Sequence, residues 1–166
     1  RARIALLRPQ GERAMSSGLE LKELAQLGGQ QIRELKRLEI SDQQVEFGGS
    51  FKRSIDECLS GSPNAIRGLA ILFAGSPMGL VVLKRPPLSP AWASEDMVTL
   101  HGLKIDIRWQ GKGYGRAAFS SAMDLCKSIW SDAKQLALSV DAGNQVALSL
   151  YKSFGMTDSG PIYQGR

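Results

Sequence analysis

The sequence predicts an α+β (mixed α/β) fold, in which one mixed β-sheet carries helices on both faces. Three observations lead to this class: apolar residues at helical spacing in the front part, two nearly continuous apolar runs in the middle, and a strand–loop–helix–strand–helix order at the back. With 166 residues, 43% of them hydrophobic and 22% charged, the chain fits one globular domain. We expect this domain at 19–166, after a basic N-terminal segment at 1–18.

The front of the domain should contain one strand and two helices. Alternating leucines from Leu19 predict the strand, which the glycine pair at 28–29 ends. Apolar residues then recur at the spacing of one helical face, first in one segment and then in a second. These residues are Ile32, Leu35 and Leu38 in the first segment, and Phe51, Ile55, Cys58 and Leu59 in the second.

The middle of the chain predicts a β-hairpin followed by a long strand. The apolar runs at 65–73 and 78–84 are separated only by an Ala-Gly-Ser-Pro turn. Strands this apolar on both faces need helices over at least part of each face. A proline-containing loop follows and ends in Glu95 and Asp96. A further strand should then run from Met97 to Ile107.

The back of the chain alternates between helix and strand. An apolar stripe predicts a helix that ends near Trp130, and alternating Leu136, Leu138 and Val140 predict the next strand. Asn144 should open a last helix, because asparagine is a favoured N-cap, and Gly155 should end it. A short final strand is expected before the chain ends.

Composition argues against several classes of function. The net charge of +5 comes from scattered residues, and the densest basic cluster alternates with glutamates, as on a solvated helix face. We therefore expect no nucleic-acid partner, although a basic nucleic-acid-associated module is an alternative that salt-dependent binding to DNA would reveal. A single histidine and the lack of a Cys-x-x-Cys pair argue against a metal site.

The same composition places the protein in the cytoplasm. Cys58 and Cys126 lie in apolar patterns, where buried thiols in a reducing compartment are the simplest interpretation. No run of about 20 apolar residues and no secretory leader are visible, so we expect neither a membrane span nor secretion.

One glycine-rich segment carries the clearest chemical information. Gln110-Gly111-Lys112-Gly113-Tyr114-Gly115-Arg116 lies between a predicted strand and a predicted helix. Glycines let a ligand approach the backbone amides, and a helix N-terminus offers unpaired N–H groups and a positive dipole end. The segment therefore predicts a pyrophosphate site, with positive charge added by Lys112 and Arg116.

Two other nucleotide-binding motifs fit this segment less well. A Walker A loop needs serine or threonine after Gly-Lys, and here Gly113 follows. A dinucleotide fingerprint, Gly113-x-Gly115-x-x-Ala118, would leave too little chain for the remaining strands of that fold. A tight turn that binds nothing is the minority interpretation, because three glycines crowd at one turn.

Two motifs together resemble the GNAT superfamily of acyl-CoA-dependent N-acyltransferases. Gln110, Gly113 and Gly115 match its Gln/Arg-x-x-Gly-x-Gly/Ala motif. The segment from Asn144 to Met156, with Ala147, Leu150, Tyr151, Lys152, Phe154 and Gly155 at the matching positions, is similar to its second motif. The resemblance implies a GNAT-like fold: one central, mostly antiparallel mixed sheet of about six strands, flanked by about four helices. It also implies acetyl-CoA as the acyl-donor cosubstrate, with no metal.

The resemblance further implies a binding set for acetyl-CoA. Backbone groups around 103–105 would bind the thioester carbonyl and the pantetheine amides, the glycine loop would bind the pyrophosphate, and the last helix would complete the site. The expected residues are Leu103, Lys104, Ile105, Gln110, Gly111, Lys112, Gly113, Tyr114, Gly115, Arg116, Asn144, Ala147 and Tyr151.

The resemblance points to one residue as the general acid but does not single out the general base. Tyr151 matches the general acid of the family, and its alternative role is that of a tyrosine at the edge of the core. Many members of the family carry a glutamate in the fourth strand, but the stretch 98–102 contains no carboxylate. The candidate bases are therefore His101, Glu95 and Asp96, and the two carboxylates, which lie just before the strand, would act through water.

The implied reaction transfers an acetyl group to a primary amine of a small molecule or peptide in a ternary complex. A catalytically silent acyl-CoA sensor on the same fold is the main alternative. Little chain follows Gly155, so the sheet near 156–163 would have a bare edge. A second subunit, residues beyond Arg166, or the apolar run Ile4-Ala5-Leu6-Leu7 could cover this edge, and we expect a homodimer more often than a monomer.

Overall fold

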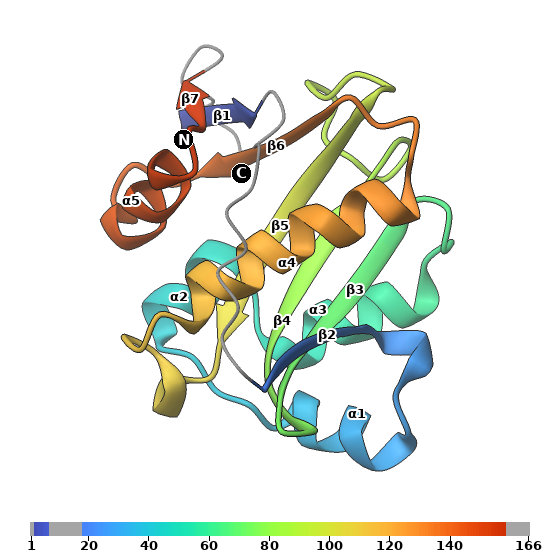
Figure 1. Cartoon of the computed structure of the whole chain (residues 1–166), viewed down its shortest axis with the longest axis vertical. Helices are drawn as coiled ribbons and strands as arrows, with labels where there is room; N and C mark the ends of the chain where they lie inside the picture. The colour runs from blue at the N-terminus through green and yellow to red at the C-terminus, as the bar shows by residue number, and fades with distance from the viewer. Residues whose placement is uncertain (1, 7–17, 159–166) are drawn as a thin grey trace.

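The computed structural model describes residues 2–6 and 18–158 (Figure 1). Its strands are β1 (Ala2–Leu6), β2 (Leu19–Glu23), β3 (Ile66–Phe73), β4 (Ser76–Lys84), β5 (Met97–Ile105), β6 (Gln135–Val140) and β7 (Thr157–Asp158). Its α-helices are α1 (Gly29–Lys36), α2 (Asp42–Gly48), α3 (Phe51–Ser60), α4 (Tyr114–Ile129) and α5 (Gln145–Ser153), and short 3-10 turns lie at Leu24–Gln26 and Ile107–Trp109.

The strands form one mixed sheet in the order β2-β3-β4-β5-β6-β1-β7. All neighbouring pairs are antiparallel except β5 and β6, which run parallel. The expected mixed, mostly antiparallel sheet is therefore confirmed. The predicted hairpin is also present, as β3 and β4.

The two faces of the sheet are buried under different helices (Figure 1). Alternate residues of β3 show why: Leu69 and Ile71 belong to one core cluster, whereas Ala70 and Leu72 belong to the other. The first cluster includes the buried stripe of α4, and the second includes apolar residues of α1 and α3. Because both faces are covered, β3 and β4 are apolar throughout, as the sequence predicts.

Two local predictions were incomplete. Helix α2 was not predicted, because its polar sequence has no apolar stripe and none of its residues is buried. Its signal was the capping box, in which the Ser41 hydroxyl accepts from the Gln44 amide while the Gln44 side chain accepts from the Ser41 amide. Strand β5 ends at Ile105 rather than at Ile107, which lies in a 3-10 turn and is 51% exposed.

The N-terminal strand covers the edge of β6. Strand β1 pairs with β6 from Leu136 to Val140 and on its other side with the two-residue β7. Residues 4–6 of the run that was a candidate cover therefore pair with β6, and Ile4 and Ala5 also pair with residues 157–158, so the protein's own chain covers this part of the predicted bare edge. Leu7 lies outside the described residues. The homodimer stays a prediction, and the part of the final strand expected beyond 158 lies outside the described residues.

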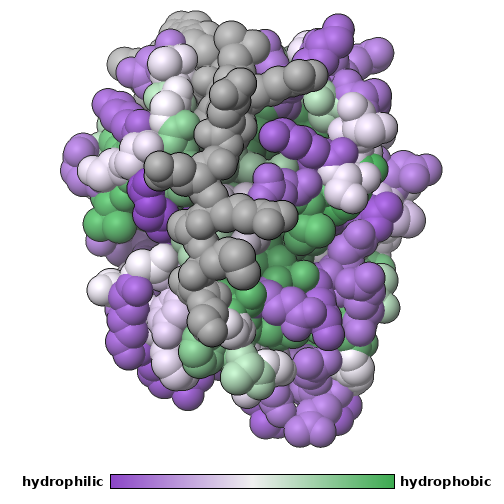
Figure 2. Space-filling model, in the orientation of Figure 1, coloured by the Kyte–Doolittle hydropathy of each residue, from purple (hydrophilic) through white to green (hydrophobic). Residues whose placement is uncertain are grey.

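On the face shown in Figure 2, hydrophobic residues are visible between hydrophilic ones, and hydrophilic residues make up most of the outline. In the residues that the structure describes, no helix combines the length and the apolar character needed to cross a membrane.

Candidate active site

The centre of the site is a gap between β5 and β6. These strands pair in parallel from Met97 to Leu100, and the pairing ends there. The end of pairing coincides with a bulge, because Val81 opposes Leu103 while Leu83 opposes Leu100. His101 and Gly102 therefore occupy the place of one residue, and Gly102 takes a φ of 115°, which L side chains rarely adopt.

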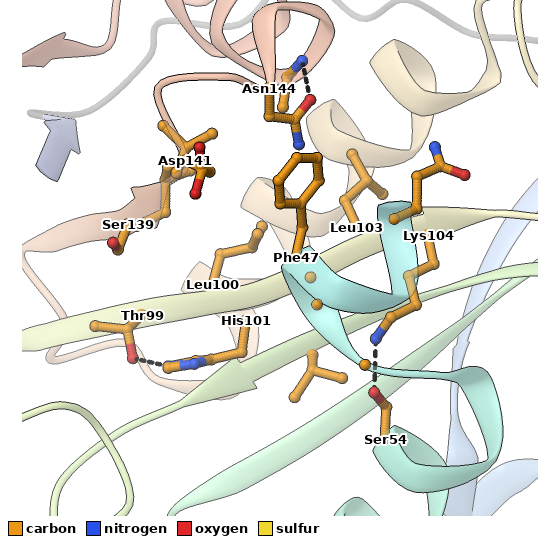
Figure 3. Close-up of a pocket in the computed structure, with 18 of the residues that line it drawn as sticks. Phe47, Ser54, Thr99, Leu100, His101, Leu103, Lys104, Ser139, Asp141 and Asn144 are labelled. Carbon is orange, nitrogen blue, oxygen red and sulfur yellow. Dashed lines mark hydrogen bonds between the residues drawn. The ribbon is translucent and has the colours of Figure 1, made fainter. Parts of the chain in front are cut away.

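A cleft of about 680 Å³ extends from this gap (Figure 3). It is lined by β5 from Thr99 to Ile105, by β6 and its following turn, by α2 and α3 on one side, and by α5 on the other. Beyond Leu100, the edge of β5 that faces β6 has no strand partner in the described part of the chain. Backbone N–H and C=O groups on such an edge are available to a ligand with amide groups.

Tyr151 reaches the cleft from α5. Its side chain is 6% exposed and packs against Phe119 with 5.2 Å between the ring centroids. Burial raises the pKa of Tyr151 to about 12, so the phenol is protonated at neutral pH. Its hydroxyl has no hydrogen-bond partner among the described residues, although buried hydroxyls are normally paired. Such a donor at a cleft wall is available to a ligand.

Asn144 and Ala147 lie at the start of α5, beside the same cleft. The Asn144 side-chain oxygen accepts a hydrogen bond from the Ala147 amide at 3.2 Å. The expected capping role of Asn144 is therefore confirmed. The ligand contacts that we assign to both residues stay predictions.

His101 lies in the cleft on the bulge of β5. Its Nε2 is 2.7 Å from the Thr99 hydroxyl, which is also within hydrogen-bond distance of the Lys84 carbonyl. The hydroxyl has a single hydrogen and lies 3.3 Å from that carbonyl, so the donor of the 2.7 Å contact depends on the tautomer of His101. Burial, together with the nearby charge of Lys84, lowers the pKa of His101 to about 4. The ring is therefore neutral at physiological pH and is a weaker base than a solvent-exposed histidine.

Glu95 and Asp96, the other candidate bases, do not line the cleft. Glu95 is exposed on the loop before β5, and its backbone carbonyl accepts from Arg85 at 2.8 Å. Asp96 lies 3.7 Å from Lys134 and accepts from Ser94. His101 is therefore the one candidate base that the structure brings to the same cleft as Tyr151.

The glycine loop, residues 110–116, leads into α4 and includes its first turn. Gly111 and Gly113 have φ values of 73° and 84°, and no atom lies within 4 Å of where a Cβ would stand on either. At these two residues the backbone is therefore open to a ligand, and its positive φ favours glycine. Both residues lie beside the positive end of the 16-residue helix α4. Tyr114 and Gly115 form the first turn of that helix.

The side chains of this loop make contacts within the protein. Gln110 donates to the Ile105 carbonyl at 2.8 Å and to Gln44 at 3.0 Å, which joins the loop to the end of β5 and to α2. Lys112 lies 5.0 Å over the ring of Trp109. Arg116 donates to the Ser153 hydroxyl and lies 4.6 Å over Phe154, so it joins α4 to α5. Residues 110–116 are not among those that line the 680 Å³ cleft.

Sequence reasoning missed the role of Asp106. This carboxylate is 1% exposed and accepts from the Glu39 amide at 3.1 Å and from the Arg108 side chain at 2.7 Å. Burial alone would raise its pKa, but these hydrogen bonds outweigh burial and the pKa is lowered. Asp106 thereby joins the segment before α2 to the end of β5, so it fixes the shape of one cleft wall. Its position directly after an apolar strand was the available signal.

The side chain of Lys104 was also missed, since only its backbone was expected to contribute. It is 5% exposed, and its Nζ donates to the Ser54 hydroxyl of α3 at 2.6 Å (Figure 3). Burial lowers the pKa of Lys104 to about 8. Among the described residues, no cluster of three or more metal-ligating side chains is present.

Comparison with known proteins agrees with this geometry. A Bacillus subtilis (strain 168) protein, named as a ribosomal protein bS18 alanine N-acetyltransferase, is 36% identical over 69 residues; the match spans 42% of this chain and 44% of that protein. The ribosomal-protein-S18-alanine N-acetyltransferase from Escherichia coli superposes with a TM-score of 0.61 at 20% identity, over 86% of this chain and 79% of that one. The aminoglycoside N-acetyltransferase AAC(6')-Iy in complex with CoA superposes with a TM-score of 0.66 at 11% identity, over 92% and 97%.

At these identities the two structural matches establish the fold. Family membership comes from the sequence: the profile of the acetyltransferase (GNAT) family matches residues 32–156, most of the chain. This range includes the gap between β5 and β6, the glycine loop and Tyr151. The chain therefore belongs to the GNAT family of acetyltransferases.

Proposed function

We propose that this protein transfers the acetyl group of acetyl-CoA to a primary amine, by direct attack of the amine in a ternary complex. The observation that carries the proposal is that the unpaired edge of β5 beyond Leu100 and Tyr151, whose hydroxyl has no partner among the described residues, line the same cleft. The first feature suits the amide-rich pantetheine arm, and the second suits a departing sulfur. The glycine loop, with its open amides at Gly111 and Gly113, suits the pyrophosphate.

The reaction forms a bond from the amine nitrogen to the acetyl carbon and breaks the bond from that carbon to sulfur. Backbone N–H groups on the β5 edge would stabilise the negative charge that develops on the acetyl oxygen. Tyr151 would donate its hydroxyl proton, or a strong hydrogen bond, to the departing sulfur. The proton lost by the amine would go to the neutral ring of His101, directly or through water, and from there to the solvent. The products are an N-acetyl amide and the thiol of CoA.

Binding of acetyl-CoA is the first test. At about 100 times its Kd, a ligand stabilises the folded state by about 2.7 kcal/mol, which raises the Tm of a chain of this size by roughly 5–11 °C. Gly113→Val should abolish this shift, because the side chain would occupy the open space at the loop and strain a φ of 84°. Gly75→Val is the matched control, since Gly75 has a φ of 81° and equally open space but lies in the β3–β4 turn.

Both variants should lose similar stability, and only Gly75→Val should keep the shift with acetyl-CoA. An unchanged Tm of the unmutated protein at millimolar acetyl-CoA would refute the proposal. A panel of amines then tests transfer, with release of the CoA thiol as the readout. Binding without thiol release for any amine would favour the silent sensor instead.

A further inference from the structure

The cleft contains a buried positive charge that the proposed reaction does not use. The side chain of Lys104 passes between two glycines: a Cβ on Gly48 would lie 3.7 Å from its Cε, and a Cβ on Gly102 would lie 3.2 Å from its Nζ. It ends at the Ser54 hydroxyl, 2.6 Å away. Both glycines and Ser54 line the cleft, so the ammonium group lies at its wall.

The carboxylates of the cleft do not neutralise this charge. Among the described residues, none forms an ion pair with Lys104. Glu57 forms an ion pair with Lys84, Asp141 accepts from the Gly143 amide at 2.9 Å, and Glu46 is exposed on α2. Burial lowers the pKa of Lys104, and the nearby charge of Glu57 raises it but does not offset burial. A buried ammonium with one hydroxyl as its hydrogen-bond partner is therefore unfavourable unless something else compensates it.

Two neighbouring features add to the positive potential. Ser54 lies at the start of the second turn of the ten-residue α3, close to the positive end of its dipole. Arg53, also at this end of α3, lines the cleft. A ligand atom beside Lys104 and Ser54 would therefore meet one buried cation, one hydroxyl donor and the positive end of a helix.

We propose that Lys104 and Ser54 bind an anionic group of the acceptor, so that the substrate is an amine that also carries a carboxylate, as an amino acid does. This inference rests on the proposed function and names the acceptor class of the same cleft. Lys104 follows His101 by three residues on the stretch of β5 that borders the gap. Lys104, His101 and Tyr151 line the same cleft, so a carboxylate at Lys104 would hold an amine on the same molecule within that cleft. Polyamines bear no anion and would be repelled.

The experiment compares acceptors that differ only in charge. Acetyl transfer is measured for the proteinogenic amino acids and for their carboxamides, with spermidine as a polycation. For the preferred amino acid, kcat/KM should exceed that of its amide by about tenfold or more, as for one hydrogen-bonded charge pair. Lys104→Met should bring this ratio close to one, chiefly by raising the KM of the acid. Ser54→Ala should lower the ratio by a smaller factor.

Lys52→Met is the matched control. Lys52 is an exposed lysine of α3, the helix that carries Ser54, and it does not line the cleft. It should leave the ratio unchanged. An acetyl-CoA thermal shift retained in Lys104→Met shows that the variant is folded and binds the donor. Preference for spermidine or amides over every acid, or an equal loss for acid and amide in Lys104→Met, would overturn the inference and leave the acetyltransferase proposal standing. Failure of every amine would instead count against the proposed function.

Discussion

Replacing Tyr151 by phenylalanine separates its two roles, because the structure predicts opposite effects on stability and activity. The ring packs on Phe119 and contributes to the core, and phenylalanine keeps that contact. The hydroxyl has no hydrogen-bond partner in the described part of the chain, so its removal breaks no hydrogen bond there and leaves one fewer polar group in a largely buried side chain. An unsatisfied buried hydroxyl destabilises by about 1–3 kcal/mol. We expect Tyr151→Phe to unfold at the same Tm or a few degrees higher.

Activity should fall at the same time. A lost hydrogen bond to a charged group, worth about 1.5–3 kcal/mol, corresponds to about 10–150-fold in kcat. A lost proton donor corresponds to roughly 10²–10⁴-fold. Because burial raises the pKa of Tyr151 to about 12, well above that of a thiol at about 8.5, the phenol donates a strong hydrogen bond more readily than a full proton. We therefore expect a loss near 10²-fold, with the affinity for acetyl-CoA unchanged.

The assay is thiol release at saturating acceptor, together with thermal unfolding of both proteins with and without acetyl-CoA. An alkaline limb of the pH–rate profile below about pH 10 would belong to another group, since Tyr151 ionises near pH 12. A kcat within twofold of the unmutated enzyme would show that the tyrosine is only part of the core. A large loss of stability would show that its hydroxyl has a partner in the folded protein.

Three further predictions concern buried charges. His101, with its pKa lowered to about 4, should make the protein lose on the order of 2–3 kcal/mol as the pH falls from about 6.5 to 4, and denaturant titrations of His101→Gln should show a flatter dependence in that window. Lys104, whose pKa is lowered to about 8, destabilises the fold at neutral pH, so Lys104→Met should raise the Tm at pH 7, and the gain should shrink as the pH rises from 8 to about 10.5; a constant gain would contradict the assignment. Asp106→Asn should lower the free energy of unfolding by about 1–3 kcal/mol at pH 7, because Asp106 accepts from Arg108 and from the Glu39 amide, and the difference should disappear as the pH falls below about 4 and the carboxyl of the unmutated protein protonates.

The sequence by itself determined the fold class, the family and most element boundaries. Periodicity was sufficient for α3, α4 and the β3–β4 hairpin, because burial on a helix or strand selects apolar residues at a fixed spacing. The glycine loop was predictable for a different reason. The backbone at Gly111 and Gly113 has a positive φ, which favours glycine whatever the rest of the fold, so the sequence shows it locally. Asn144 as the cap of α5 is equally local.

Only the tertiary structure decided how the cleft is composed. The bulge at His101–Gly102 depends on which residues of β4 and β5 face one another. The register between two strands cannot be derived from the sequence of either strand alone. The N-terminal strand β1 pairs with β6, more than 120 residues away in sequence, so a local pattern could not assign it. The contacts of Lys104 with Ser54 and of Asp106 with Glu39 likewise join distant segments. Such buried polar pairs depend on the shape of the assembled core, which forms only when the helices close over the sheet.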